Sequence, residues 1–449
     1  MPNLPRGRVA VRALVPGTRG CRIPTHGGRL EFVHLAERPA GFGGAGGFAC
    51  QGSPLIGTLL AASSAVGGAA HPPIGTRNLN TRECDNRTQG AATLMKTIAV
   101  ILTFCAGLAG QAPSGERHQF VIHNFRTESG VTLPEARVVY GTYGRLNADK
   151  SNAVLMPSHY MANYRGYTWL IGPAKALNPD GLYLVCTELF GNGSSSSPSN
   201  TPEPFHGPRF PVTSIRDNVE AVHKLLAEEL GITHLKAIIG FSMGAQQAFQ
   251  WAVSYPDFAT GIVATSGTAK TWPHGIVRLE GQIAALTADP AFQNGDYTSP
   301  PAKGLEAFGM VWAAWLYSQE WWRNELWKTS SPPATTFEQY MASFKKRFSA
   351  DANDYILQAR TWEKHDIGAT PGFNGDIRKA LGAIKVPFLY MPSETDLYFP
   401  LGDARYESQF MPTVTFRPIP SLWGHTAGAA SNPADAKFLN ETIAKFLGL

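Results

Sequence analysis

The sequence contains little cysteine and little charge. Only five of its 449 residues are cysteine and none has C-x-x-C spacing, which excludes a disulfide scaffold and a thiolate zinc site. Charged residues make up only 16%, whereas 43% of the residues are hydrophobic and ten are tryptophan. The chain can therefore bury a sizeable core, and disorder is excluded for most of it. The length suits two or three average domains or one large α/β domain with an insertion.

The net charge of +5 comes from the first 94 residues, which contain ten Arg, no Lys and four acidic residues. The remaining residues carry 29 basic and 30 acidic groups. A nearly neutral body lacks the basic surface that nucleic acids require, so nucleic-acid binding is excluded.

Residues 1–94 are rich in glycine and proline, with 16 and 8 of them, and show no hydrophobic period. We predict a low-complexity, disordered leader or an over-extended start. Residues 41–46 spell G-x-G-x-x-G, but a dinucleotide site needs a strand before the motif and a helix after it. The apolar run at 54–70 is not hydrophobic enough for us to predict a stable membrane span.

Residues 95–112 have the three parts of a signal peptide. Lys96 supplies the basic start, residues 97–110 an apolar stretch too short to span a bilayer, and residues 107–109 a small-x-small exit. If translation starts at Met95, we expect export to the periplasm or medium, with a catalytic domain at 113–449. Otherwise the segment is a short helix in front of a cytoplasmic domain.

Protein expressed from Met95 in its native host is expected to lose this segment, because the small residues at its end suit cleavage after export. Intact-mass measurement of the fractionated cells checks this. A cytosolic species whose mass retains Met95–Ala109 would show that the segment is a structural extension.

From His118 onward, strands and helices alternate. The pattern predicts a hairpin of 120–125 and 136–143, strands at 153–157, 182–186, 235–239, 260–265, 386–391 and 414–419, and helices at 214–230, 244–254 and 434–446. This rhythm indicates a mostly parallel sheet with helices on both faces. The aromatic, helical stretch at about 269–382 interrupts it and is predicted to be a lid.

The strongest chemical signal is Gly240-Phe241-Ser242-Met243-Gly244, which lies between a predicted strand and a predicted helix. The glycines allow a turn too tight for side chains, and the turn lifts the Ser242 hydroxyl above the sheet. We predict that Ser242 is a nucleophile and that the N–H of Met243 faces the developing oxyanion. The alternative is an ordinary turn between a strand and a helix.

A serine nucleophile needs a histidine that removes its proton. His425 follows the last predicted strand and precedes the last helix, which is where the order Ser, Asp, His places the base. His274 and His365 lie in the predicted lid, and a capping role for His425 is the alternative.

The acid that orients the histidine should follow the strand 386–391. Asp396 is the preferred candidate. Glu394 lies nearer the strand end and could cap the loop, and Asp403 suits the start of a helix.

A second oxyanion donor is expected after the third strand, from the backbone N–H of Tyr160 or Met161. His159 in the same loop is interpreted as a structural residue rather than as a second base. This chemistry needs no metal and no cofactor.

Several linked motifs resemble the homoserine O-acetyltransferase group of α/β-hydrolases, over about residues 118–449. They are YGTYGRLNADKSN at 140–152, LIGPAKAL at 170–177, GPRFP at 207–211, IRDN at 215–218, GFSMG at 240–244, WAVSYP at 251–256 and DAN at 351–353. The resemblance implies an α/β-hydrolase core, a helical lid, and a triad of Ser242, Asp396 and His425.

The chain departs from that group where substrate would be recognised. The turn that carries the nucleophile reads G-G-S-M-G-G-M in that group, whereas residues 240–246 of this chain read G-F-S-M-G-A-Q. The group also holds the carboxylate of its substrate with an arginine, and the aligned position in this chain is Ile283. Arg278 is five residues earlier, about 140° around a helix, and does not obviously replace it. We therefore predict hydrolysis of an ester or related acyl substrate.

Two other functions remain open. The first is an O-acyltransferase that uses an acyl-CoA as co-substrate, and the second is a binding protein that has lost the chemistry. The partner is expected to be a small acyl molecule. The sequence does not fix the oligomeric state, for which a homodimer is the candidate.

Overall fold

The computed structural model describes residues 114–330 and 333–449. Its centre is an eight-stranded sheet in the order β1-β2-β4-β3-β5-β6-β7-β8, with the antiparallel pairs β1-β2 and β2-β4 and otherwise parallel neighbours. The strands are β1 (Glu116–Arg126), β2 (Thr132–Tyr143), β3 (Ala153–Pro157), β4 (Tyr183–Thr187), β5 (Ala237–Phe241), β6 (Ile262–Thr265), β7 (Phe388–Met391) and β8 (Val414–Phe416). The predicted leader and signal-like segment lie outside the described residues.

The predicted strands are all present, and all except β3 have at least one shifted end. β3 has the predicted bounds, and β5 begins and ends two residues later than predicted. β8 ends at Phe416 rather than at Ile419, although the N–H groups of Arg417 and Ile419 still donate to the carbonyls of Tyr390 and Pro392 (2.8 Å each). Beyond the strand, Ile419 forms only an isolated bridge with Ser393.

The helices fill the connections between the strands. They are α2 (Ile215–Lys224), α3 (Met243–Ser254), α4 (Pro273–Thr287), α5 (Ala302–Leu316), α6 (Gln319–Arg323), α7 (Phe337–Lys345), α8 (Ala352–Glu363), α9 (Ile377–Ala383), α10 (Leu401–Ser408) and α11 (Pro433–Leu447). Short 3-10 turns are η2 (Gly207–Arg209), η4 (Pro290–Gly295), η5 (Leu326–Thr329), η6 (Ile367–Ala369) and η7 (Gly424–Ala429). The helix predicted at 214–230 ends at Lys224 and continues as a π-helical turn, Leu225–Glu229.

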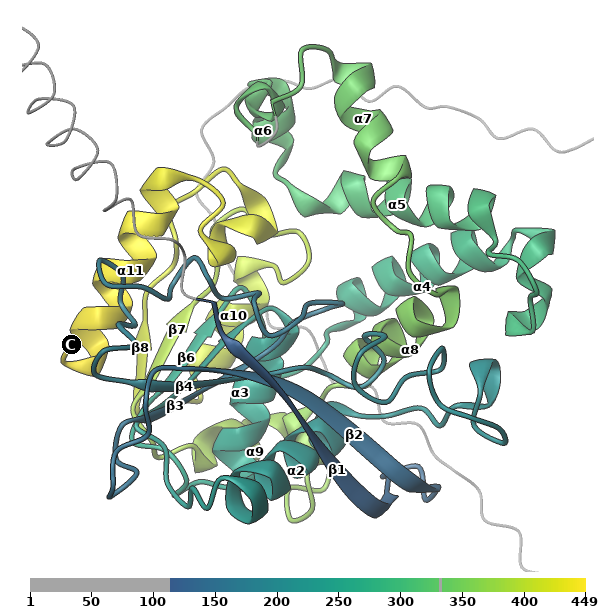
Figure 1. Ribbon diagram of the computed structural model, residues 1–449. Coiled ribbons are helices and arrows are strands. Elements are labelled where there is room, and N and C mark those ends of the chain that lie inside the picture. Colours follow the sequence, from purple (N-terminus) through teal and green to yellow (C-terminus); the bar gives the residue numbers. More distant parts are fainter. Residues whose placement is uncertain (1–113, 331–332) are drawn as a thin grey trace, which may run out of the picture. The chain divides into compact units, whose positions relative to one another are not determined.

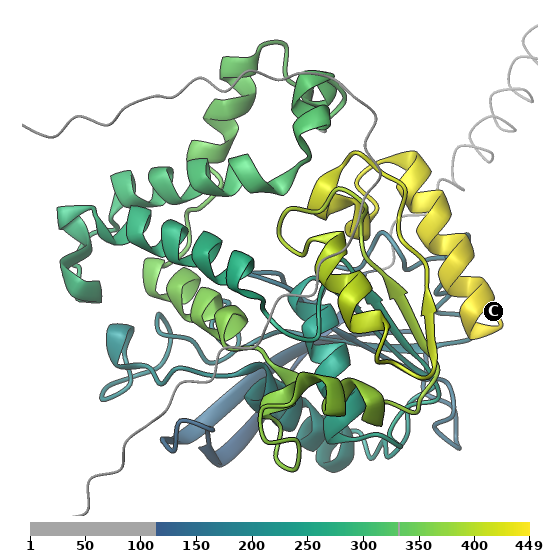
Figure 2. The same ribbon diagram turned by 180° about the vertical axis from the view of Figure 1, so that it is seen from behind.

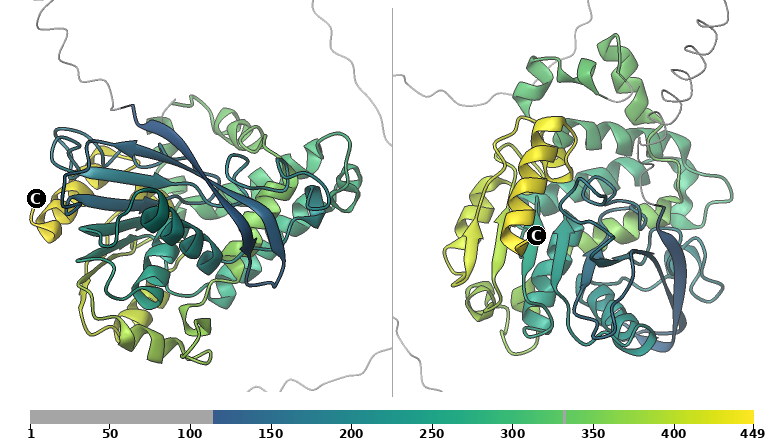
Figure 3. Two further views of the ribbon diagram at one scale, coloured as in Figure 1. Left: turned by 60° about the horizontal axis from the view of Figure 1, so that its bottom comes forward. Right: turned by 60° about the vertical axis from the view of Figure 1, so that its left-hand side comes forward.

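The two faces of the sheet bury different cores, because successive side chains of a strand point to opposite faces. Ile238 of β5 packs with residues of α2 and α3, whereas Ile239 packs with Leu439 and Ile443 of α11. Figures 1 and 2 accordingly show α2, α3 and α9 together beside the sheet, and Figure 3 shows α11 running along it. The predicted mostly parallel sheet with helices on both faces is confirmed.

The helices α4 to α8 form an excursion between β6 and β7, which stands apart from the sheet in Figure 1. Its two ends meet: the N–H of Ile367 donates to the carbonyl of Ala269 (3.1 Å), and Lys270 forms an ion pair with Asp366 (2.7 Å). We call these paired ends the lid stem. The predicted lid range, 269–382, extends beyond the stem and includes most of α9, which packs against α3 instead.

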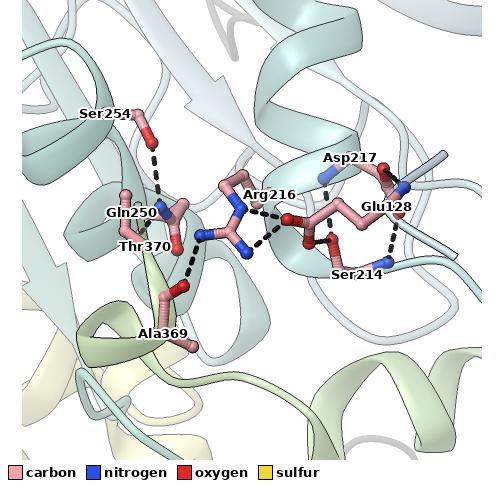
Figure 4. A network of polar contacts seen from close by, with 8 residues as sticks. All are labelled: Glu128, Ser214, Arg216, Asp217, Gln250, Ser254, Ala369 and Thr370. Carbon is pink, nitrogen blue, oxygen red and sulfur yellow. Dashed lines mark hydrogen bonds and ion pairs between the residues drawn. The ribbon is translucent and has the colours of Figure 1, made fainter. Parts of the chain in front are cut away.

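The chain that returns from the lid is tied to the core by a polar network (Figure 4). Arg216 of α2 pairs with Glu128 in the β1-β2 turn and donates to the carbonyl of Ala369 (3.1 Å). Gln250 of α3 donates to the hydroxyl of Thr370 (2.9 Å). These contacts hold the returning segment against α3, the helix that begins after Ser242.

Candidate active site

Ser242 occupies a sharp turn between β5 and α3. Its backbone has a φ of 57° and a ψ of −124°, a strained conformation that side chains other than glycine rarely adopt. A Cβ atom at Gly240 would lie 2.0 Å from the carbonyl oxygen of Gly244, and one at Gly244 would lie 2.4 Å from that of Pro157. Both glycines are therefore required by the turn.

Ser242, His425 and Asp396 form one chain of hydrogen bonds. The Oγ of Ser242 lies 2.9 Å from the Nε2 of His425, and the Nδ1 of His425 lies 2.9 Å from the Oδ2 of Asp396. The other carboxylate oxygen of Asp396 accepts the backbone N–H groups of Tyr398 (2.7 Å) and Phe399 (3.1 Å). These two N–H groups fix the carboxylate, which in turn fixes the ring of His425. The arrangement can pass a proton from a serine hydroxyl to an imidazole.

The three side chains come from separate loops at the carboxyl ends of parallel strands, where the sequence places them. Asp396 follows β7 and is buried, whereas the alternative Glu394 is exposed. Asp403 lies in the first turn of α10, as predicted for it. His425 belongs to η7, and the N–H of the preceding Gly424 donates to Thr395 (3.1 Å).

The three N–H groups expected to bind the oxyanion, those of Met243, Tyr160 and Met161, differ in whether they already have a hydrogen-bond acceptor. Within the described chain we find no hydrogen-bond acceptor for the N–H of Met243 or of Tyr160. The N–H of Met161, in contrast, donates to the Oε1 of Gln358 on α8 (2.6 Å). The structure therefore leaves Tyr160, rather than Met161, with an unengaged N–H in this loop.

His159 packs its ring against aromatic side chains. Its centroid lies 4.9 Å from that of Phe241 and 6.1 Å from that of Tyr167, both edge to face. Burial, together with the nearby His425, lowers the pKa of His159 to about 4. His159 is therefore neutral above about pH 5, and it makes no hydrogen bond to Ser242, His425 or Asp396.

Aromatic rings from the lid and the loops form a wall beside the triad. The ring centroid of Tyr398 lies 4.7 Å from that of His425, and that of Phe399 lies 5.6 Å away. Tyr160 stacks on Trp312 of α5 at 5.1 Å, and Trp362 of α8 stacks on Phe399 at 5.1 Å. The wall is closely packed, and Ser242 is only 2% exposed.

Sequence reasoning missed that Arg278 belongs to this wall. Its guanidinium carbon lies 4.0 Å from the ring centroid of Tyr398 and 4.4 Å from that of Trp362. Ile283 of the same helix is buried as well, although it lies on a different side. Both are buried because α4 packs against α5 on one side and against α8 on another. Contacts of this kind leave no signal in the spacing of a single helix.

The described residues offer no obvious place for a metal. No three histidine, cysteine or acidic side chains lie close enough together to hold an ion in residues 114–330 and 333–449. None of the helices in that part of the chain combines the length and the apolar composition of a membrane span.

Comparisons with known proteins agree with this fold. The family described as "alpha/beta hydrolase fold" matches residues 164–427. Ethyl acetate hydrolase of Pseudomonas veronii is 38% identical over 66% of this chain and 86% of its own length, and a homoserine O-acetyltransferase of Corynebacterium glutamicum is 32% identical over 66% and 85%. The crystal structure of an acetylester hydrolase from Corynebacterium glutamicum superposes with a TM-score of 0.71, at 31% identity over 74% of this chain and 96% of that one.

Proposed function

The chain belongs to the α/β-hydrolase fold family, and we propose that it hydrolyses short-chain esters, acetates above all, through an acyl-Ser242 intermediate. The family and its esterase and acetyltransferase relatives make it an enzyme of acyl hydrolysis or acyl transfer. The observation that carries the choice of residues is the hydrogen-bonded chain Ser242–His425–Asp396, with 2.9 Å at each link.

In this mechanism, the Nε2 of His425 takes the proton of Ser242 as the Oγ attacks the ester carbonyl carbon. The N–H groups of Met243 and Tyr160 stabilise the oxyanion of the tetrahedral intermediate. His425 then donates its proton to the leaving alcohol, and the acyl group stays on Ser242. Water, deprotonated by His425, attacks the acyl carbonyl, and the carboxylic acid leaves as Ser242 recovers its proton. Asp396 keeps the Nδ1 proton of His425 in place throughout.

Three observations favour water and a short acyl group. The resemblance implies that Ile283 stands where the acetyltransferases have the arginine that holds the substrate carboxylate. The relative named for ethyl acetate shares a larger fraction of its residues with this chain than the acetyltransferase does. The rings of Tyr160, Trp312 and Tyr398 pack closely next to the triad, which leaves little room for a long chain.

A series of p-nitrophenyl esters from acetyl to decanoyl tests this proposal. We expect kcat/KM to be highest for the shortest esters and at least about tenfold lower for the decanoyl ester. Methylene groups that the site cannot accommodate weaken the binding of the transition state by about 1–3 kcal/mol or more. The same preparation is incubated with acetyl-CoA and either homoserine or serine. Consumption of acetyl-CoA that depends on the added alcohol, with negligible ester hydrolysis, would instead identify an O-acyltransferase.

A further inference from the structure

Two glutamines hold the loop that carries the second oxyanion donor. Gln247, one turn into α3 from Ser242, donates its Nε2 to the carbonyl of Ser158 (2.8 Å). Gln358 of α8 accepts the N–H of Met161 with its Oε1 (2.6 Å) and donates its Nε2 to the carbonyl of Phe190 (3.1 Å). Both glutamines are buried. The loop is thus fixed at one end by the nucleophile's own helix and at the other by the lid.

The helix that presents Gln358 is itself fixed to the core. Asp354 of α8 accepts the N–H (3.0 Å) and the hydroxyl (2.6 Å) of Ser199. One helical turn after Gln358, Thr361 donates to the carbonyl of Thr213 (3.1 Å). These bonds lie on both sides of Gln358 along α8, so the helix is docked at two places by contacts other than those of Gln358 itself.

The conformation of the loop needs such support. Met161 has a φ of 54°, which costs a residue with a side chain about 1 kcal/mol. The bond to Gln358 compensates for this and sets the orientation of the peptide between Tyr160 and Met161. The N–H of Met161 is engaged by Gln358, whereas the N–H of Tyr160 has no acceptor within the described residues and can bind an oxyanion.

We propose that Gln358 is a positioning residue for the oxyanion hole: it holds the N–H of Met161 so that the N–H of Tyr160 faces the reacting carbonyl. Gln358 does not touch the substrate and acts through the backbone of the loop. The inference rests on the proposed function, because an oxyanion hole contributes to catalysis only if the attack of Ser242 forms a tetrahedral intermediate.

Three variants test this role. Gln358→Leu removes both hydrogen bonds at similar volume, and Gln358→Glu keeps an acceptor for Met161. Thr361→Val weakens the docking of α8 one turn away and serves as the matched control. The measurements are kcat and KM for p-nitrophenyl acetate, the rate at which a fluorophosphonate labels Ser242, the affinity for a trifluoromethyl ketone and the free energy of unfolding.

For Gln358→Leu we expect kcat, the labelling rate and the ketone affinity to fall together by about 10- to 100-fold, because a displaced donor no longer stabilises the oxyanion. KM should stay within about twofold, since the ester itself gains little from that donor. Thr361→Val should leave all of these values near those of the wild type.

Gln358→Glu should recover activity as the pH falls. A buried glutamic acid has a raised pKa, and only its protonated form can donate to the carbonyl of Phe190 while it accepts from Met161. The ratio of its kcat to that of the wild type should therefore rise towards low pH.

An unchanged kcat in Gln358→Leu would overturn the proposal, and a faster kcat would overturn it and mean that Gln358 blocks the N–H of Met161. If Thr361→Val lowered kcat, the labelling rate and the ketone affinity as much as Gln358→Leu does, the proposal would also be overturned. The docking of α8 alone would then explain the losses. A wild-type protein that neither hydrolyses esters nor reacts with the fluorophosphonate would instead refute the proposed function, and this inference with it.

Discussion

Replacing Ser242 by alanine is expected to lower kcat for ester hydrolysis by about 10⁶-fold, the scale seen when a serine hydrolase loses its nucleophile. The acyl group then has no oxygen to which it can be transferred, and His425 has no proton to remove. Hydrolysis of p-nitrophenyl acetate and labelling by a fluorophosphonate, both followed in the purified variant, measure the effect.

Ser393→Ala is the matched control. Ser393 is also fully buried, lies three residues before Asp396, and its hydroxyl has no hydrogen-bond partner within the described chain. We expect it to hydrolyse esters and to be labelled as the wild type is. Labelling that survives in Ser242→Ala would place the reactive serine elsewhere in the chain.

Replacing Glu407 by leucine is expected to lower the free energy of unfolding by about 2–6 kcal/mol, because two buried donors lose their acceptor at about 1–3 kcal/mol each and the half-buried indole of Trp272 loses its acceptor as well. The carboxyl group of Glu407 accepts the N–H of Ala269 (3.0 Å), the hydroxyl of Tyr390 (3.0 Å) and the indole N–H of Trp272 (2.9 Å). Urea unfolding measures the loss. Glu306→Leu, at an exposed position of α5, should change the free energy of unfolding by less than about 0.5 kcal/mol.

The loss should depend on pH. Burial raises the pKa of Glu407 from 4.5 to about 7, so the folded protein holds this proton more tightly than the unfolded chain does. Its contribution to stability is therefore largest below about pH 4.5 and falls as the pH rises to about 7. The leucine variant lacks this titration, and its destabilisation should be larger at pH 5 than at pH 8. Equal losses at the two pH values would show that Glu407 titrates normally.

Much of the site could be predicted because its signals are local. The turn at Ser242 needs Gly240 and Gly244 within five residues, and the spelling of the motif carries that requirement. Asp396 and His425 each follow a predicted strand, so their places at neighbouring strand ends could be predicted from the sequence. The strand ends themselves were less predictable: β8 stops at Phe416, although single hydrogen bonds from Arg417 and Ile419 continue beyond it.

The residues that were missed act across long stretches of sequence. Gln358 meets Met161 only because α8 folds back over the loop after β3. Arg278 joins the wall because α4 is covered on two sides. A polar residue on a mostly apolar helix gives no hint of which distant backbone group it will face.

The lid stem makes the lid a self-contained insert. Since Ala269 and Ile367 are already hydrogen-bonded to each other, a chain of different length and sequence can span that point without moving β6 or β7. Ser242, Asp396 and His425 all lie outside it. Evolution or design can thus exchange the part of the wall that Trp312, Trp362 and Arg278 supply and retain the triad. Such an exchange has one condition, which is that the incoming segment must bring its own acceptor for the N–H of Met161.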